Sequence, residues 1–210
     1  MEKRVHLFLN GNYDKTAYAF YQKIFEYSAN TLWAVDGGAN FLVECGVRPA
    51  FLVGDFDSIL PANLKKLHDV PQQRFAEQKD ATDTELTIDL AYRNGFNEIV
   101  LVGGCGETDH ELGNLFQLQS KDPHVWMCDP YQDVFRITNS EVKLGGEIGK
   151  KLSIIPISSE VKLSGKGLLY PLEGEVVFQN STRTLRNEFS EQRVSCSAEG
   201  DAWVIVGRNP

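Results

Sequence analysis

The sequence predicts an α/β protein in which a parallel-sheet, Rossmann-like α/β domain is followed by an all-β sandwich domain. In the first part of the chain, short apolar runs alternate with helix-like segments, which is the pattern of a parallel sheet covered by helices. After about Tyr131 the apolar runs are broken by Gly, Ser, Asn and Pro, as in a small β-sandwich. We therefore place the domain boundary between residues 1–132 and residues 133–210.

Five apolar runs of the first part are continuous rather than alternating, as expected of parallel strands that are buried on both faces. These runs are Val5–Leu9, Leu32–Val35, Phe51–Val53, Ile99–Val102 and Val125–Met127. The seven short runs of the second part are expected to be the strands of the sandwich. They are Val134–Ile137, Val142–Leu144, Leu152–Pro156, Val161–Leu163, Val176–Phe178, Val194–Ser197 and Trp203–Val206.

Three helices are expected between the strands of the first part. The segment Asn40–Cys45 is followed by a glycine, which suits the position after a helix. Thr82–Asn94 and Thr108–Gln119 each begin with a Thr-x-x-Glu capping box. The last of these segments also places three apolar residues on one face, namely Leu112, Leu115 and Phe116.

Composition excludes several classes of function. A net charge of −8 without a cluster of Lys and Arg argues against binding to nucleic acid. The chain has no apolar stretch near the roughly 18 residues that a membrane span needs, and the apolar run near its start is too short for a signal peptide. Its four cysteines lie far apart without CxxC spacing. We therefore expect reduced thiols, a cytoplasmic location and no association with a membrane.

Acidic residues gather where strands of the first part end. Asp36 follows the second run, Asp55 and Asp57 follow the third, and Asp80 and Asp83 precede or begin a helix. Acidic residues at a helix start also stabilise the helix dipole, by about 0.3–1 kcal/mol each, and polar turns after strands are common. Because open parallel sheets bind ligands at the carboxyl ends of their strands, however, clustered carboxylates at this edge favour a Mg²⁺ site.

A glycine-rich loop follows the fourth run of the first part. The segment Gly103-Gly104-Cys105-Gly106 precedes an expected helix, whose backbone N–H groups suit phosphate. The segment is neither a Walker A motif nor a dinucleotide-binding fingerprint, and His110 alone would more often be a surface residue than a catalyst. Carboxylates at three places and this loop together predict a magnesium–nucleotide site for phosphoryl transfer.

Six short motifs, in this order along nearly the whole chain, resemble those of the thiamine pyrophosphokinase family. They are Asp36-Gly37-Gly38-Ala39, Gly54-Asp55-x-Asp57-Ser58, Asp80-x-Thr82-Asp83, Gly106-x-x-Asp109-His110, Gly167-Leu168-x-Tyr170-Pro171-Leu172 and Asn187-Glu188. The resemblance implies a homodimer with active sites at the subunit interface. It also implies the transfer of a pyrophosphoryl group from ATP to the hydroxyl of thiamine, giving thiamine diphosphate and AMP.

The resemblance further implies a role for each matching residue. The Mg²⁺ ligands and catalytic residues would be Asp55, Asp57 and Asp83. Support for the metal and for ATP would come from Asp36, Gly37, Ser58, Asp80, Thr82, Gly104, Gly106, Asp109 and His110. Thiamine would be contacted from the second domain by Tyr170, Asn187 and Glu188.

Two positions depart from the family pattern. Glu107 stands where the family usually has Arg, and Arg186 stands where it favours Ser, so that Arg186 is a candidate source of the missing positive charge. Three alternative functions stay open at this point. They are a phosphatase with Asp55 as the nucleophile, the same fold acting on another alcohol such as a hydroxymethylpterin, and a nucleotide-binding protein without activity.

Overall fold

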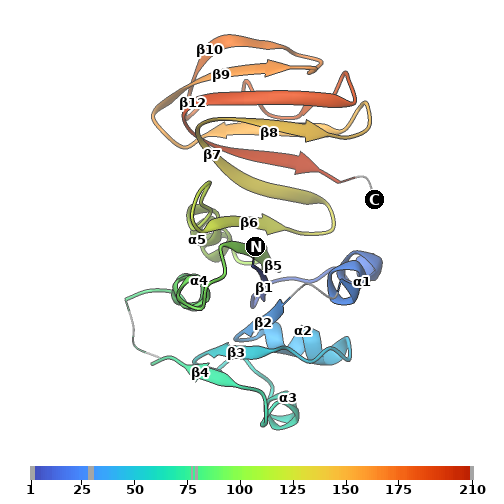
Figure 1. The fold of residues 1–210 in the computed structure, drawn as a ribbon, viewed down its shortest axis with the longest axis vertical. Helices are drawn as coiled ribbons and strands as arrows, with labels where there is room; N and C mark the ends of the chain where they lie inside the picture. Colours follow the sequence, from blue (N-terminus) through green and yellow to red (C-terminus); the bar gives the residue numbers. More distant parts are fainter. Residues whose placement is uncertain (1–2, 28–30, 77, 79, 209–210) are drawn as a thin grey trace. The chain divides into compact units, whose positions relative to one another are not determined.

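A computed structural model of the protein describes residues 3–27, 31–76, 78 and 80–208, and is drawn in Figure 1. The chain divides into two compact units, Met1–Pro130 and Tyr131–Pro210. Unit 1 contains both helices and strands, and unit 2 is built from strands. The prediction of a mixed α/β protein is therefore confirmed. Over the described residues, no helix combines the length and the apolar character of a membrane span.

The strands of unit 1 form a parallel sheet in which every described neighbour pair runs in the same direction. In spatial order they are β6 (His124–Cys128), β5 (Glu98–Val102), β1 (Arg4–Phe8), β2 (Thr31–Val35), β3 (Phe51–Gly54) and β4 (Gln72–Arg74). Five of them coincide with the five apolar runs that the sequence predicts, except that the first run extends one residue, Leu9, beyond the end of β1. The strand β4 was not predicted because its three residues are polar and exposed, so that it carries no apolar signal.

The helices of unit 1 lie on both sides of this sheet, with α1 and α2 on one side and α4 and α5 on the other (Figure 1). The helical segments are η1 (Lys15–Ala17), α1 (Tyr18–Glu26), α2 (Gly38–Glu44), α3 (Pro61–Lys66), α4 (Asp83–Arg93) and α5 (Thr108–Phe116). The predictions did not include α1 or α3. The helix α3 has six residues, which is too short for a helical period to be read from sequence.

The two predicted capping boxes have different outcomes. Thr82 caps α4, because its side chain accepts a hydrogen bond from the backbone N–H of Glu85 at 3.2 Å. The second box was wrong: Thr108 is already the first residue of α5, and Glu107 occupies the cap position without a side-chain cap bond. The predicted apolar face of α5 does not enter the core, since Leu112 and Phe116 are exposed.

Unit 2 is an antiparallel β structure around its own core. Its strands are β7 (Gln132–Gly145), β8 (Lys151–Pro156), β9 (Glu160–Lys166), β10 (Leu172–Phe178), β11 (Asn187–Glu188) and β12 (Arg193–Gly207). The strand β12 pairs with β7 along its length, with β9 over its first part and with β8 over its last part. In addition, β10 pairs with β9 and β11 pairs with β8.

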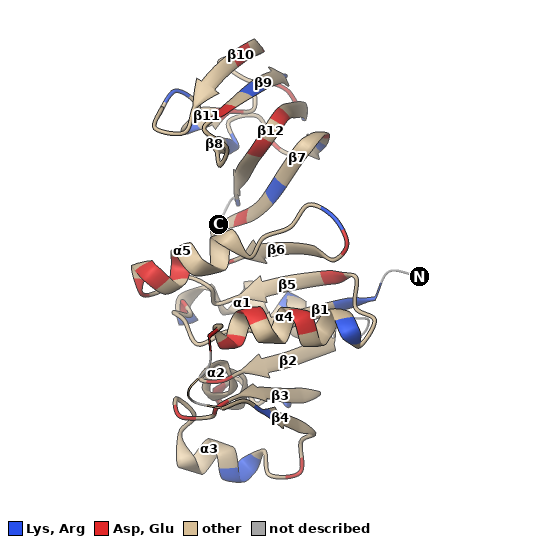
Figure 2. Ribbon diagram, turned by 90° about the vertical axis from the view of Figure 1, so that its left-hand side faces the viewer, with Lys and Arg blue, Asp and Glu red and all other residues tan. Residues whose placement is uncertain are grey.

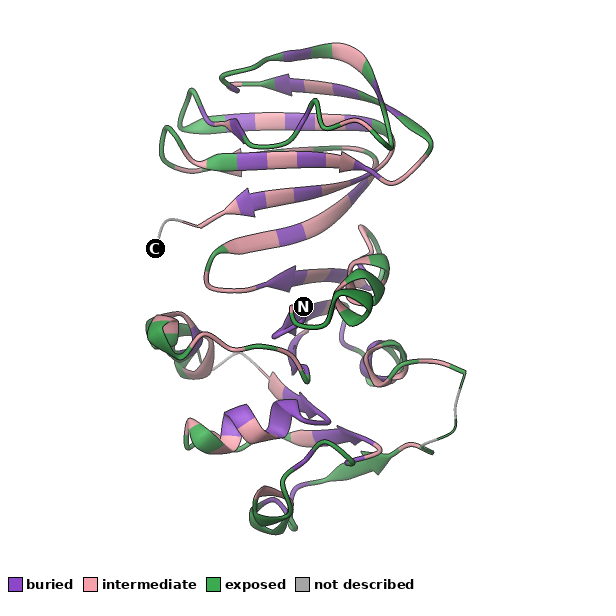
Figure 3. Cartoon of the chain, turned by 180° about the vertical axis from the view of Figure 1, so that it is seen from behind, coloured by how far each residue is buried: buried purple, intermediate pink, exposed green. Residues whose placement is uncertain are grey.

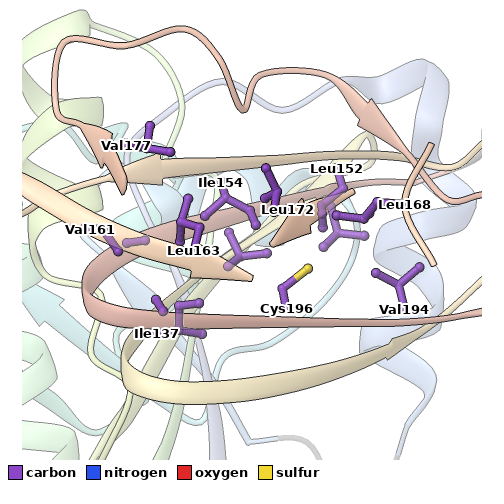
Figure 4. Packing of buried hydrophobic residues seen from close by; sticks show 14 of the residues in the cluster. Ile137, Leu152, Ile154, Val161, Leu163, Leu168, Leu172, Val177, Val194 and Cys196 are labelled. Carbon is purple, nitrogen blue, oxygen red and sulfur yellow. The ribbon is translucent and has the colours of Figure 1, made fainter. Parts of the chain in front are cut away.

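Alternate residues of these strands are buried, and their side chains meet in one apolar cluster (Figures 3 and 4). Ile154 of β8 and Leu163 of β9 lie in this cluster with Cys196 of β12. Four predicted short runs turn out to be the halves of two long strands, β7 and β12. Both strands continue through their polar gaps, because β7 and β12 stay paired on either side of a register shift. At this shift the side chain of Asn139 accepts a hydrogen bond from the N–H of Gly200 at 2.8 Å.

Candidate active site

A cleft of about 660 Å³ opens in unit 1 at the carboxyl ends of the parallel strands. The loops after β1, β2, β3 and β5 line it together with the first residues of α4 and α5. The residues that line this cleft include nine that the sequence analysis named as site residues, namely Asp36, Asp55, Asp57, Ser58, Thr82, Asp83, Gly104, Gly106 and His110. Most of the site residues that were predicted in unit 1 therefore lie together in one cleft. The cleft is at the carboxyl ends of the parallel strands, where open parallel sheets bind their ligands.

Four aspartates converge in this cleft. Carboxylate oxygens of Asp36, Asp55 and Asp57 all lie within 4.8 Å of one another. Asp83, the first residue of α4, lines the same cleft. Burial, together with the negative charges of Asp55, Asp57 and Asp83, raises the pKa of Asp36 to about 6. Like charges are held together here at an electrostatic cost, which is the condition in which a carboxylate cluster binds a cation.

The backbone after β3 turns sharply so that both of its aspartates can face the cleft. Phe56, between them, has a φ of 70°, a left-handed conformation that is unusual for a bulky residue. Its N–H donates to Oδ1 of Asp36 at 2.9 Å, and its ring is buried in the core. Asp36 is itself left-handed, with a φ of 48°. The hydrogen bond between these two strained residues therefore links the loop after β2 to the loop after β3, and it brings the carboxylates of the two loops close together.

Some predicted residues have a local structural role or lie elsewhere. The Ser58 hydroxyl donates to Oδ1 of Asp57 at 2.8 Å, which orients that carboxylate toward one position. The backbone at Gly37 packs against Asn10, because a Cβ there would lie 1.9 Å from Asn10 Oδ1. Asp80 and Asp109 are exposed and do not line the cleft. Asp109 accepts a hydrogen bond from the backbone N–H of His110 at 2.9 Å.

The glycine-rich loop after β5 is fixed by hydrogen bonds to its carbonyl groups. Asn114 of α5 donates from its side chain to the carbonyl of Gly104 at 3.0 Å, and the N–H of Asn12 donates to the carbonyl of Cys105 at 2.8 Å. Burial and the nearby Asp129 raise the pKa of the Cys105 thiol to about 12. This thiol therefore stays protonated at neutral pH and is not a nucleophile.

The loop after β1 also lines the cleft, and the sequence reasoning missed it. Asn10, Gly11 and Asn12 follow the first buried strand, just as the predicted aspartates follow theirs. A Cβ on Gly11 would lie 2.0 Å from the carbonyl oxygen of Gly103, so the two loops are in close contact. The sequence signal that could have identified this loop is the segment Asn10-Gly11-Asn12, which directly follows the apolar run Val5–Leu9. Thr84, Glu107 and Asn114 are further lining residues that were not predicted to bind ligand.

Aromatic packing anchors the loop after β1. The ring of Tyr13 stacks on that of Phe41 in α2, with 3.9 Å between their centroids. The Tyr13 hydroxyl donates to the carbonyl of Leu9 at 2.6 Å. Burial raises the pKa of this hydroxyl well above its usual value, so Tyr13 remains a neutral donor. The hydrophobic core thus fixes a cleft-lining loop that has few apolar residues of its own.

Comparison with known proteins identifies the family of this chain. Residues 22–127, just over half of the chain, match the family model for the thiamin pyrophosphokinase catalytic domain. The chain belongs to the thiamin pyrophosphokinase family. A thiamine pyrophosphokinase of Bacillus subtilis (strain 168) is 29% identical over 194 residues, covering 84% of this chain and 87% of the relative.

Solved structures of thiamine pyrophosphokinases share the fold of this chain. The B. subtilis crystal structure has a TM-score of 0.84 at 23% identity, covering 99% of this chain and 100% of that one. The Candida albicans structure has a TM-score of 0.79 at 17% identity, covering 99% of this chain and 90% of that one. At these identities the likeness concerns the fold.

The three residues that the thiamine pyrophosphokinase resemblance assigned to thiamine lie together in unit 2. The side chain of Asn187 accepts from the N–H of Tyr170 at 3.1 Å and donates to its carbonyl at 2.7 Å. Glu188 forms an ion pair with Lys151, while the Tyr170 side chain is exposed. Asn187 is buried, so it acts here as a clamp that fixes the Tyr170 backbone.

Replacing Asn187 by Ala is expected to lower the free energy of unfolding by about 2–4 kcal/mol, since three part-buried backbone groups, the N–H and carbonyl of Tyr170 and the N–H of Glu188, lose their partner. Urea denaturation followed by circular dichroism measures this change. Asn187→Asp, which keeps the acceptor and loses the donor, should fall between the wild type and the Ala variant. An Ala variant as stable as the wild type would show that the clamp is not needed.

Proposed function

We propose that the protein transfers the pyrophosphoryl group of ATP to the hydroxyl of thiamine, producing thiamine diphosphate and AMP. The observation that carries this proposal is the cluster of aspartates facing a glycine-rich loop in one cleft, in a chain of the thiamin pyrophosphokinase family. The reaction is a displacement at phosphorus, in which positioning and charge neutralisation supply most of the catalysis. Both are functions that this cleft can serve.

The aspartate cluster fits Mg²⁺ by its chemistry and its spacing. All of its donors are carboxylate oxygens, which Mg²⁺ prefers, and octahedral Mg²⁺ places its oxygen ligands up to about 4 Å apart. The observed oxygens of Asp36, Asp55 and Asp57 lie within 4.8 Å of one another, close to that span. The sequence-based assignment named Asp83 as the third ligand. By spacing, Asp36 is the third member of the cluster, and we propose that Asp83 binds from the start of α4.

Bound Mg²⁺ would neutralise charge on the phosphate oxygens of ATP. The chain's own groups orient the substrates around it. Backbone N–H groups of the Gly103–Gly106 loop and of the start of α5 favour the phosphates, as a helix N-terminus does. The thiamine hydroxyl then attacks the β-phosphorus, the bond from that phosphorus to the oxygen of AMP breaks, and AMP leaves with the electron pair. The hydroxyl proton passes to solvent or to a carboxylate of the cleft.

Glu107 replaces a cation with an anion at the edge of this phosphate site. It lines the cleft with His110, and α5 begins with further acidic residues (Figure 2). A carboxylate here repels phosphate unless a metal ion screens it. We therefore propose that this chain depends more strongly on Mg²⁺ for ATP binding than relatives with Arg at this position. We also propose that Arg186 offsets part of the lost charge.

For the remaining features we propose the arrangement that the family resemblance implies. Unit 1 is the Rossmann-like catalytic domain, and unit 2 is a β-sandwich that contacts thiamine through Tyr170 and Glu188 and forms a homodimer. An exposed aromatic ring suits the cationic thiazolium and the flat pyrimidine of thiamine. All four cysteines are free thiols, which supports a cytoplasmic location.

The raised pKa of Asp36 makes metal-free stability depend on pH. With a folded-state pKa of about 6 against an ordinary value of 3.8, the folded protein holds a proton that the unfolded chain has already lost. The free energy of unfolding should therefore fall between pH 4 and pH 6, by about 2–3 kcal/mol from this group. Urea denaturation in EDTA measures the fall.

Asp36→Asn keeps the acceptor for the N–H of Phe56 and cannot ionise, so the fall due to this group should vanish. Saturating Mg²⁺ should also reduce it in the wild type, since the cation compensates the carboxylates. A variant that shows the same pH slope as the wild type would contradict the shifted pKa.

An AMP assay with a panel of alcohols tests the function against its alternatives. ATP and Mg²⁺ are supplied alone, with thiamine, or with a hydroxymethylpterin, and AMP is measured by chromatography. We expect AMP with thiamine only. AMP with the pterin would identify another acceptor, phosphate release without any alcohol would favour a phosphatase, and ATP binding without AMP would favour a binding protein.

A further inference from the structure

The edge strand β4 is attached to the metal-site loop without burying any side chain. Its three residues, Gln72–Arg74, are exposed and pair with β3 in parallel register (Figure 3). The partner of Arg74 in this register is Gly54, the last residue before Asp55. The N–H of Phe75 donates to the carbonyl of Gly54 at 2.9 Å. Burial of apolar side chains therefore does not hold this strand in place, and its described contacts are with β3 and with the loop that follows β3.

Arg74 reaches from β4 to both residues that begin this loop. Its Nε donates to the carbonyl oxygen of Asp55 at 3.1 Å. Its guanidinium carbon lies 4.9 Å from the centroid of the Phe56 ring, within the range of a cation–π contact. Neither Arg74 nor Phe56 lines the cleft. Arg74 and Phe56 line a separate depression of unit 1, whereas the side chains of Asp55 and Asp57 line the nucleotide cleft.

The loop needs such support because its backbone is strained. A left-handed conformation at a residue such as Phe56 persists only where surrounding contacts over-determine it. On the cleft side, Asp36 holds the N–H of Phe56, but the same carboxylate belongs to the proposed metal site. On the other side, Arg74 holds the Asp55 carbonyl and the Phe56 ring. Arg74 is thus a side chain that contacts both residues of this turn without itself belonging to the proposed set of metal ligands.

We infer that Arg74 is a positioning residue for the metal site, which it serves by holding the Asp55–Phe56 backbone in the turn that directs Asp55 and Asp57 to one ion. The inference rests on the Mg²⁺ site of the proposed function. The described contacts of Arg74 are with the Asp55 carbonyl and the Phe56 ring rather than with a carboxylate side chain, so the positioning effect is transmitted through the loop.

This role and simple electrostatics predict opposite results. Arg74 is a cation near a cluster of carboxylates, so by Coulomb repulsion alone its removal would tighten the binding of a divalent ion. If Arg74 holds the carboxylates in place, its removal weakens that binding. The sign of the change in metal affinity therefore separates the two.

The test measures Mn²⁺ binding to the full chain without nucleotide, by electron paramagnetic resonance of the free ion. Arg74→Met removes both the donor and the charge, and we expect the Kd for Mn²⁺ to rise about tenfold, the effect of losing one charged hydrogen bond. Arg74→Lys retains the charge but cannot make the planar contact, so its Kd should rise also. The matched control is Arg48→Met in the same unit, where an exposed Arg pairs with Asp69, and its Kd should stay within about twofold.

Steady-state kinetics give a second readout. The KM for Mg²⁺ should rise in Arg74→Met, while kcat at saturating Mg²⁺ stays within about twofold of the wild type. A folded Arg74→Met or Arg74→Lys protein that binds Mn²⁺ as tightly as the wild type, or more tightly, overturns the inference. A wild type that binds no Mn²⁺ overturns the metal site itself, and with it this inference.

Discussion

Asp57→Asn is expected to lower the turnover of AMP formation by about 100- to 1,000-fold while the protein stays folded, because one anionic ligand of the proposed metal site is lost. The amide preserves shape and still accepts the hydrogen bond from Ser58, so the local structure should persist. AMP release at saturating ATP, thiamine and Mg²⁺ measures the change, and circular dichroism verifies the fold.

The control for this variant is Asp69→Asn, which removes one negative charge from an exposed ion pair of the same unit. Its turnover should remain near that of the wild type. If Asp57→Asn also retained near-wild-type kinetics, the metal would have to bind elsewhere, and the proposed use of the cleft would be wrong.

Gly11→Ala should have the second largest effect. The added Cβ would lie 2.0 Å from the carbonyl oxygen of Gly103 and 2.4 Å from that of Cys105. Both neighbours are backbone atoms, so the loops after β1 and β5 would have to separate. We expect the free energy of unfolding to fall by about 1–3 kcal/mol, as in other overpacked sites, and the affinity for ATP to fall at least about tenfold.

Gly113→Ala is the matched control, since a Cβ built on this glycine of α5 meets no atom within 4 Å apart from its chain neighbours and the backbone of its own helix. Helix propensity predicts that this change is neutral or stabilising by up to about 1 kcal/mol. Urea denaturation and calorimetric titration with ATP and Mg²⁺ compare the two variants. Equal stability and equal affinity in both would show that the contact between the loops is not required.

The sheet of unit 1 and the place of its cleft could be predicted because both follow from patterns within short segments. Continuous apolar runs identify strands that are buried on both faces, and the edge where such strands end is where ligands bind. The aspartates after β2 and β3 and the capped start of α4 were found in this way. The same rule would have found Asn10–Asn12, had it been applied to the first strand.

Features that depend on contacts between distant segments could not be predicted. The left-handed turn at Phe56 is contacted by Asp36 and Arg74, which lie in other strands or loops. The strand β4 carries no apolar pattern, since it is held by backbone pairing and by Arg74. The raised pKa of Asp36 likewise arises from burial and from charges that approach only in the folded protein.

The most direct test of the central claim is the identity of both products when ATP, Mg²⁺ and thiamine react with the purified protein. Phosphorus nuclear magnetic resonance and mass spectrometry of one reaction mixture measure them together. Transfer of a pyrophosphoryl group predicts thiamine diphosphate and AMP in equal amounts, with no thiamine monophosphate as an intermediate. ADP with thiamine monophosphate, or free phosphate with unchanged thiamine, would contradict it.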